Sequence, residues 1–367
     1  MKPVLPAVGI CGWSGCGKTA LVGGLVRRLQ ARGLRVGVIK HDVHGVTHQA
    51  GGKDSDCFFQ AGADAVVLGP GEVWQRLHAG QGRSLPELIS ELDARCDVVL
   101  CEGFKTAGFA VKIWLRKVPS EQPPEDVGCV SRLLDPGEDR TAIVEGMIGE
   151  WMKARVDSTP VYGGVLIGGA SRRMGRPKHL LQLDGQTWVE RIVGAVGQWA
   201  RRVVLLGAGK VPAALGALPV LPDVENRQGP LAGMLAAMRW HPEAAWLFAA
   251  CDQPSLSAAA LDWILGLRRP GVWAVLPRNP ETQALEPLFA LYEPRARGLL
   301  EYVMAPSDLA GSPAVITPEI PAGLRRSWTD ADTTKEALQN GWLRRSQRSR
   351  AAITRRTKAG SQGPGSL

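Results

Sequence analysis

Residues 168–183 read GGASRRMGRPKHLLQL, and they follow an apolar run, VLI at residues 165–167, that predicts a buried strand. Glycines directly after a strand let the backbone approach a ligand closely, so that main-chain N–H groups can point at an anion. The same loop carries three cations and a proline: Arg172, Arg173, Pro177 and Lys178. This combination predicts a phosphate-binding loop rather than an ordinary basic surface turn.

Two further stretches downstream of this loop predict parts of the same site. The apolar run 244–250, AAWLFAA, is followed by Cys251 and Asp252. A carboxylate at the end of a strand can hold a divalent cation that bridges a triphosphate. The turn 229–233, GPLAG, precedes a predicted helix and places backbone N–H groups near its start. Taken alone, this turn could equally be a helix cap.

These motifs resemble the GGxSxRMGxxK, GPLAG and CDxP elements of the molybdenum cofactor guanylyltransferases, the MobA family. The resemblance covers residues 161–343 and implies a Rossmann-like α/β nucleotidyltransferase fold. It implies that Arg173, Lys178 and Asp252 are catalytic, with Asp252 as the Mg²⁺ ligand. The implied nucleotide-binding residues are Gly168, Gly169, Ser171, Gly175, Lys178, Asp223, Gly229, Pro230 and Leu231.

The end of this half departs from the MobA pattern. Residues 286–292, EPLFALY, resemble a family strand on the acceptor side, but residues 330–332 read DAD where the family carries asparagines. Asp332 could therefore be a second metal ligand, as in related cytidylyltransferases. A cytidylyltransferase, or another nucleotidyltransferase with a small acceptor, is the alternative enzyme.

The first half carries an independent phosphate signature. Residues 8–11 predict a short strand, residues 12–19 read GWSGCGKT, and residues 20–29 have apolar positions at helical spacing. This strand, loop and helix predict a P-loop, whose N–H groups cradle phosphates while its lysine adds charge and its threonine contacts Mg²⁺. The predicted nucleotide-binding residues are Gly12, Ser14, Gly15, Cys16, Gly17, Lys18 and Thr19.

Two other strand ends belong to this predicted site. The run 97–101 ends in Glu102, which predicts a Walker B element with Glu102 as an indirect Mg²⁺ partner, and residues 35–39 end before His41 and Asp42. Ligands bind outside the carboxyl ends of strands in open α/β sheets. The histidines at 41, 44 and 48 lack matching cysteines or carboxylates, which favours a polar loop over a metal cluster.

In this order, the P-loop, KHDVHG, GGKDS, AGADAV and LCEGFK resemble the MobB family, P-loop GTPases associated with molybdenum cofactor synthesis. The resemblance covers residues 5–117 and implies GTP binding with slow hydrolysis. No NKxD motif stands in this half, so guanine specificity follows from the resemblance alone.

Composition excludes several other classes. Seven of the cations lie within residues 344–358 without an acid, so the net charge of +9 leaves a nearly neutral body and no nucleic-acid partner is expected. Seven cysteines without a CxxC pair predict a reducing, cytoplasmic setting. No apolar run is long enough for a membrane helix. We expect two α/β domains, 1–157 and 158–343, and a disordered basic tail, 344–367.

The resulting hypothesis is a bifunctional protein of molybdenum cofactor biosynthesis. The second domain would transfer GMP from GTP to molybdenum-bound molybdopterin with Mg²⁺, releasing pyrophosphate, and the first would bind GTP to assist. Partners implied by the resemblance are molybdoenzyme apo-proteins, cofactor-insertion proteins and a second copy in a homodimer. The alternative from another class is a cofactor carrier with little turnover.

Overall fold

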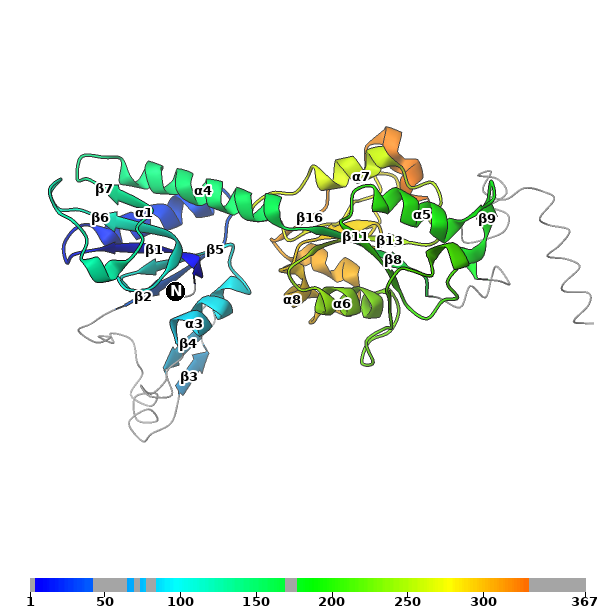
Figure 1. Cartoon of the computed structure of the whole chain (residues 1–367), viewed down its shortest axis with the longest axis horizontal. Coiled ribbons are helices and arrows are strands. Elements are labelled where there is room, and N and C mark those ends of the chain that lie inside the picture. The colour runs from blue at the N-terminus through cyan, green and yellow to red at the C-terminus, as the bar shows by residue number, and fades with distance from the viewer. Residues whose placement is uncertain (1–3, 42–64, 69–72, 77–83, 169–176, 330–367) are drawn as a thin grey trace, which may run out of the picture. The chain divides into compact units, whose positions relative to one another are not determined.

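The structure, a computed structural model, describes residues 4–41, 65–68, 73–76, 84–168 and 177–329 (Figure 1). The chain divides into two compact units, Met1–Ala154 and Arg155–Leu367. The predicted tail, residues 344–367, lies outside the described residues. Every described helix is too short or too polar to cross a bilayer.

The first unit is built on a five-stranded parallel sheet in the order β2-β5-β1-β6-β7. Its strands are β1 (Leu5–Gly12), β2 (Val36–Lys40), β5 (Val98–Glu102), β6 (Phe109–Leu115) and β7 (Arg132–Leu134). Buried side chains of α1 (Lys18–Ala31) and α4 (Arg140–Ser158) share one apolar cluster, and α3 (Leu85–Asp93) packs in another on the opposite face. A short 3₁₀ helix, Glu125–Val127, lies between β6 and β7.

The apolar run AVVL at residues 65–68 predicts a strand, and this strand forms, but outside the five-stranded sheet. β3 (Ala65–Leu68) pairs antiparallel with β4 (Val73–Arg76) in a separate two-stranded sheet. A strand pattern by itself does not specify its partner, because pairing depends on which edge is available after folding.

The second unit is a seven-stranded sheet in the order β12-β11-β8-β13-β15-β14-β16. Its strands are β8 (Val161–Leu166), β11 (Arg202–Leu206), β12 (Val220–Leu221), β13 (Ala245–Ala250), β14 (Ala274–Val275), β15 (Ala290–Tyr292) and β16 (Val315–Ile316). Only β15 among these strands runs antiparallel to its neighbours, so the sheet is mostly parallel and the predicted α/β fold is confirmed.

Helices cover both faces of this sheet. α6 (Pro230–Trp240) and α8 (Ala296–Leu300) pack into one apolar cluster, and α5 (Trp188–Gly197) and α7 (Ala258–Leu265) pack into the other. The hairpin of β9 (Gln182–Leu183) and β10 (Gln186–Thr187) leads into α5. The remaining short helices are Lys178–Leu180, Ala213–Leu215, Pro306–Gly311 and Ala322–Trp328.

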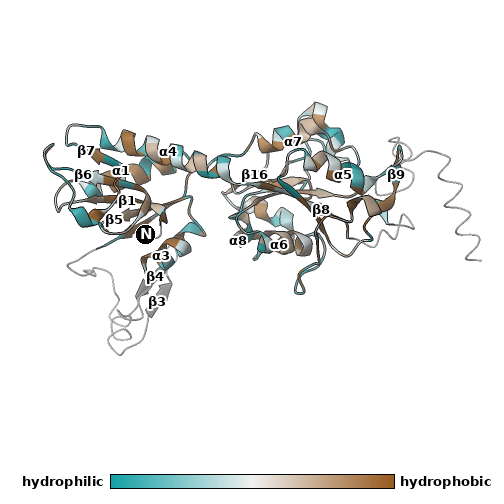
Figure 2. Ribbon diagram, in the orientation of Figure 1, coloured by the Kyte–Doolittle hydropathy of each residue, from teal (hydrophilic) through white to brown (hydrophobic). Residues whose placement is uncertain are grey.

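The end of α4 differs from the prediction. The spacing of apolar residues over 139–156 predicts a helix that ends at residue 156 and is followed by a linker. In the structure α4 continues to Ser158, with alternating hydrophobic and hydrophilic residues along its length (Figure 2). The Arg268 Nη2 donates to the carbonyl oxygens of Val156 and Thr159, at 3.1 and 3.4 Å. A basic side chain that donates hydrogen bonds to the last carbonyl oxygens of a helix stabilises the helix end. The sequence around α4 does not predict this contact, because Arg268 comes from a distant segment.

Arg268 also forms a two-pronged ion pair with Glu293, with Nε–Oε1 at 2.7 Å and Nη2–Oε2 at 3.1 Å. Replacing Arg268 with methionine should destabilise the second unit by about 3 kcal/mol, because it leaves a buried carboxylate without its cation. Urea unfolding followed by tryptophan fluorescence would measure the loss. The double variant Arg268→Met/Glu293→Leu should recover most of it, and an equal loss in both variants would contradict the explanation.

Candidate functional site

The catalytic pair predicted in the second unit is brought together by neighbouring elements. Lys178 begins the short helix Lys178–Leu180, and Asp252 follows β13. The Lys178 Nζ lies 3.0 Å from the Asp252 Oδ2, with the two side chains 14% and 24% exposed. The residues are 74 positions apart in sequence, so only the parallel sheet makes them neighbours. Lys178 contacts only the Oδ2 of this carboxylate in the described part of the chain, and a carboxylate oxygen is the kind of ligand that Mg²⁺ prefers.

A second group of predicted residues gathers at the adjacent strand ends. Gly168 follows β8 and Gly207 follows β11, and a Cβ at Gly207 would meet the Gly168 Cα and N at 3.1 Å. The Asp223 Oδ1 lies 3.3 Å from the Cβ position of Gly233 in α6. Glycine at 207 and 233 therefore lets β8, β11 and α6 approach closely, and it places the Asp223 carboxylate beside them.

The GPLAG turn forms the start of α6. Gly229 has a φ of 68°, a left-handed value that favours glycine, and Pro230 occupies the first helical turn. Among the described residues, a Cβ at Gly229 would meet nothing within 4 Å, so they leave that position at the start of the helix open. The Leu231 side chain is only 2% exposed and packs in the core. Any contribution of Leu231 to nucleotide binding therefore comes from its backbone.

Several predicted residues of this half lie outside the described residues. These are Gly169, Ser171, Arg172, Arg173, Gly175 and Asp332. Their roles stay predictions. Among the residues that the structure does describe, no three His, Cys, Asp or Glu side chains gather as a ready metal site.

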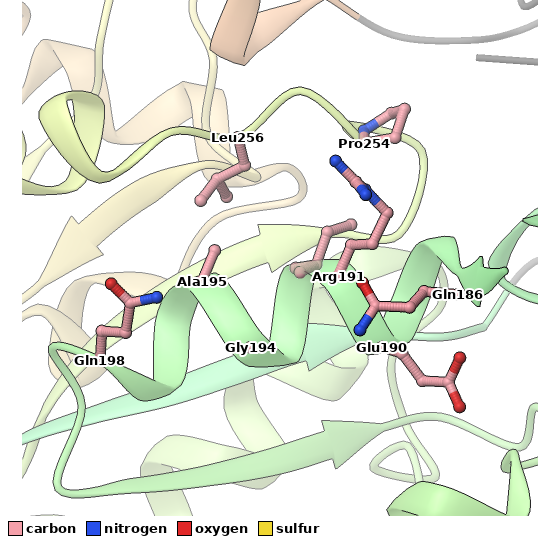
Figure 3. A pocket seen from close by; sticks show the side chains of 9 residues that line it. Gln186, Glu190, Arg191, Gly194, Ala195, Gln198, Pro254 and Leu256 are labelled. Carbon is pink, nitrogen blue, oxygen red and sulfur yellow. The ribbon is translucent and has the colours of Figure 1, made fainter. Parts of the chain in front are cut away.

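Helix α5, which starts just after the β9–β10 hairpin, borders a pocket of about 320 Å³ (Figure 3). The segment after Asp252 forms its other wall, through Pro254 and Leu256. No sequence pattern indicated this pocket, because its residues are spread over a hairpin, a helix face and a loop.

The P-loop of the first unit has the backbone that its glycines require. Gly15 and Gly17 have φ values of 75° and 93°. A Cβ at Gly12 would lie 2.6 Å from both the Leu115 carbonyl oxygen and the Cys16 Sγ, so only glycine fits there. The Lys18 Nζ donates to the carbonyl oxygens of Gly12 and Trp13, at 3.2 and 2.8 Å. The lysine thus lies over its own loop, where a phosphate would be bound.

The predicted magnesium residues of this unit also meet. The Thr19 Oγ1 donates to the Glu102 Oε1 at 2.8 Å, although 83 residues separate them. Glu102 is 6% exposed at the end of β5, beside the P-loop strand β1. A hydroxyl and a carboxylate in contact fit a Mg²⁺ site in which one oxygen binds directly and the other through water. Asp42 lies outside the described residues, and His41 stacks on Phe104 with ring centroids 5.0 Å apart.

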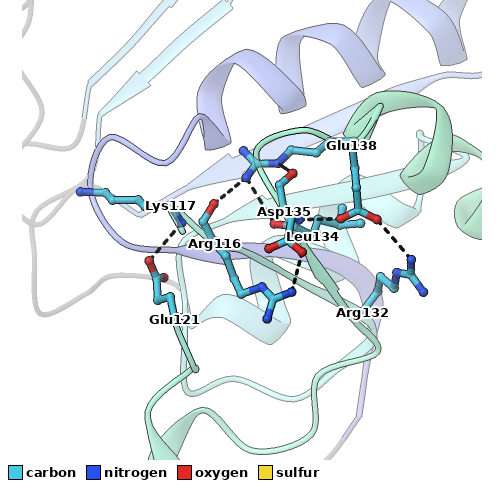
Figure 4. Close-up of polar contacts among 8 residues, drawn as sticks. Arg116, Lys117, Glu121, Arg132, Leu134, Asp135 and Glu138 are labelled. Atoms are coloured by element: carbon cyan, nitrogen blue, oxygen red, sulfur yellow. Dashed lines mark hydrogen bonds and ion pairs between the residues drawn. The ribbon is translucent and has the colours of Figure 1, made fainter. Parts of the chain in front are cut away.

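Three cations from outside the P-loop motif lie close to this loop. The Arg140 Nη1 donates to the Cys16 carbonyl oxygen at 2.8 Å, and its other nitrogens donate to the carbonyls of Asp135, Arg116 and Leu134 (Figure 4). The Lys117 Nζ lies 3.9 Å from the Cβ position of Gly15. The Lys105 Nζ lies 3.9 Å from the centre of the Trp13 ring. Arg140 therefore ties the loop to the ends of β6 and β7.

Two buried cysteines, Cys11 and Cys101, lie near the ends of β1 and β5 at this site. Burial raises the pKa of Cys11 to about 11 and that of Cys101 to about 12. All described cysteines are free, and Cys57 lies outside the described residues.

Comparison with known proteins matches the two units to two families. A family model described as molybdopterin guanine dinucleotide synthesis protein B (MobB) matches residues 7–130, and one described as MobA-like NTP transferase domain matches residues 163–319. A molybdopterin-guanine dinucleotide biosynthesis adapter protein of Haemophilus influenzae is 40% identical over 129 residues, 35% of this chain and 72% of that protein. A probable molybdenum cofactor guanylyltransferase of Deinococcus radiodurans is 32% identical over 146 residues, 38% of this chain and 74% of that protein.

The chain belongs to both families. It carries a MobB domain followed by a MobA-like NTP transferase domain. A molybdenum cofactor biosynthesis bifunctional protein of Synechocystis is 32% identical over 146 residues, which are 39% of this chain and 42% of that protein. That match spans less than half of the relative. The predicted families and the predicted α/β folds are thus confirmed.

His179 is a residue of the MobA-like domain whose role the sequence did not indicate. It is 4% exposed, and its Nε2 lies 2.9 Å from the Lys210 carbonyl oxygen. A Cβ at Gly209 would come within 3.1 Å of this imidazole. Burial lowers the pKa of His179 below its usual value of 6.5. The neutral ring can donate to Lys210, and this contact fixes the short helix that carries Lys178.

Protonation of His179 should destabilise the MobA-like domain. Because the folded state lowers the pKa of His179, the unfolded chain binds the proton more readily, and stability falls as the pH drops through 6.5. Thermal unfolding at about pH 7.5 and about pH 5.5 would measure this loss. His179→Gln keeps a donor for Lys210 without titrating, so its unfolding temperature should change less. An identical pH dependence in both proteins would contradict this assignment.

Proposed function

We propose that the MobA-like domain transfers GMP from GTP to the phosphate of molybdenum-bound molybdopterin. An oxygen of the acceptor phosphate attacks the α-phosphorus of GTP, the bond to the β-phosphate breaks, and pyrophosphate leaves. The single observation that supports this most is the contact between Lys178 and Asp252 at the end of β13. The Deinococcus relative is named as a probable molybdenum cofactor guanylyltransferase and the Haemophilus relative as a molybdopterin-guanine dinucleotide biosynthesis adapter protein, which supports the choice of guanine and molybdopterin.

Asp252 and Lys178 would divide the work on the triphosphate. Mg²⁺, held by the Asp252 carboxylate, would neutralise charge on the phosphates when bound. Lys178 now donates to Asp252 at 3.0 Å, and it would turn to the phosphates once the metal satisfies that carboxylate. The acceptor phosphate is already a nucleophile, so catalysis needs positioning and charge stabilisation rather than a strong base.

The other end of the nucleotide would lie over the strand ends on the opposite side of β8. Gly168, Gly207 and Asp223 meet there, beside the open start of α6 at Gly229. The close approach of backbone at the two glycines suits a flat base or a ribose, and Asp223 supplies a carboxylate acceptor for ribose hydroxyls or base N–H groups.

Pyrophosphate release by the purified chain tests this proposal. With Mg²⁺ and molybdopterin, GTP should support release and ATP and CTP should not. Lys178→Ala and Asp252→Asn should each lower the rate by about 10²-fold or more, because each removes a charge that acts on the transition state. Arg269→Ala removes an exposed cation and serves as the control.

Two outcomes would favour the alternatives. Release with CTP in place of GTP would move the domain to the cytidylyltransferases. Tight stoichiometric binding of GTP and molybdopterin without release would favour a carrier. A near-normal rate in both site variants would contradict the assignment of Lys178 and Asp252.

We propose that the MobB domain binds GTP and hydrolyses it slowly. The support is the P-loop with Lys18 over its carbonyls and the contact between Thr19 and Glu102. Lys18→Ala should weaken GTP binding to the MobB domain by at least about 1.4 kcal/mol, which is a tenfold increase in the dissociation constant. Titration of a fluorescent GTP analogue would measure it.

Each active-site variant is the control for the other domain. Lys18→Ala should keep pyrophosphate release, and Lys178→Ala should keep nucleotide binding at the P-loop. A loss of both activities in either variant would contradict two independent sites.

Further parts of the proposal concern location and partners. They are Mg²⁺ as the metal of both sites, a cytoplasmic location, a homodimer, and hand-over of the product to molybdoenzyme apo-proteins or cofactor-insertion proteins. The proposal includes no nucleic-acid or membrane partner.

A further inference from the structure

The pocket beside α5 has a charged side chain along its length. Arg191 extends from the helix toward Pro254, whereas Glu190 points the other way (Figure 3). The helix spans 10 residues, and at about 1.5 Å per residue this limits the pocket to about 15 Å in length. A volume of about 320 Å³ is at the lower end for small-molecule sites.

The guanidinium of Arg191 has donors that the described residues do not use. Its Nε is buried without a hydrogen-bond partner, and no ion pair to Arg191 is found in the described part of the chain. The neighbouring Glu190 is already engaged, because its Oε2 accepts from the Thr187 N–H and Oγ1–H at 2.6 and 2.7 Å. A partly buried cation without a partner is costly, and a ligand would remove that cost.

The floor of the pocket is kept open by a small residue. Gly194 lies inside α5, where a Cβ would meet no atom of the described residues within 4 Å. Glycine in a helix interior lowers stability relative to alanine, and close packing does not require it here. The amides of Gln186 and Gln198 lie toward the two ends of the pocket.

We propose that this pocket binds a small organic anion through a carboxylate or phosphate group held by Arg191. The planar fork of a guanidinium matches two oxygens of such a group, and the glutamine amides can contact the remainder. Pro254 follows Asp252 by two residues, and Gln186 follows Lys178 by eight. An anion bound here therefore lies against both segments that carry the catalytic pair.

Isothermal titration calorimetry with citrate, and separately with inorganic phosphate, tests the proposal. The full chain would carry Lys18→Ala, so that the P-loop does not contribute. At least one of the two anions should bind, and Arg191→Gln should weaken that binding at least tenfold. Gly194→Leu should also abolish it by filling the pocket, whereas Gly194→Ala is the matched control and should retain it.

Absence of binding by both anions, or binding unaffected by Arg191→Gln, would overturn the proposal. Circular dichroism and the unfolding temperature show whether each variant is folded. If Gly194→Leu does not fold, the effect of Arg191→Gln on anion binding alone tests the proposal. Calorimetry does not depend on turnover. The anion-binding proposal can therefore fail while the guanylyltransferase proposal holds, and the guanylyltransferase proposal can fail while anion binding is found.

Kinetics distinguish two sources of the anion. If the group belongs to the acceptor substrate, Arg191→Gln should raise KM for molybdopterin and leave KM for GTP unchanged. If it belongs to a separate metabolite, both KM values should be unchanged, and citrate or phosphate should alter the rate of the Arg191 protein but not of the variant. If Arg191→Gln changes neither the KM for molybdopterin nor the effect of citrate or phosphate on the rate, the proposal is contradicted.

Discussion

Parallel pairing of β8 with β11 and β13 is the constraint on which the nucleotidyltransferase site depends. Parallel strands end at the same edge of a sheet, so the loops that follow them converge. Gly168 follows the central strand, Asp252 follows one neighbour, and Gly207 follows the other. In the MobB domain, β1 and β5 converge in the same way and bring Thr19 to Glu102. Both sites are therefore products of strand order.

Arginines that donate hydrogen bonds to backbone carbonyls connect the loops and helix ends around these sheets. Arg140 connects the P-loop to the ends of β6 and β7 through four carbonyl oxygens, and Arg268 connects the end of α4 to Glu293. A guanidinium has five donors in a rigid fork, so one side chain can satisfy several acceptors from different segments. Arg191 has the same guanidinium group, but it lines a pocket and its Nε has no partner among the described residues. For this reason we propose it as a ligand-binding residue.

The sequence predicted the site residues that belong to continuous motifs. The P-loop, the strand before Glu102, the GPLAG turn and the strand before Asp252 were all recognisable, because each couples a strand or helix pattern to glycine or a carboxylate at a set spacing. Arg140, Lys117 and His179 were missed. Arg140 and Lys117 contact the P-loop from distant segments, whereas His179 lies next to Lys178 and contacts the distant Lys210. A single arginine, lysine or histidine carries no local pattern that distinguishes such a contact from a surface or core position.

The sequence by itself determined the two families, the alternation of strands and helices, and the groups available for phosphate and metal chemistry. These follow from local periodicity and from backbone requirements such as the positive φ of Gly15 and Gly17. Only the tertiary structure decided that Lys178 meets Asp252, that β3 pairs outside the main sheet, and that Arg191 borders a pocket. Such contacts depend on strand order and on packing between remote segments, which local patterns do not encode.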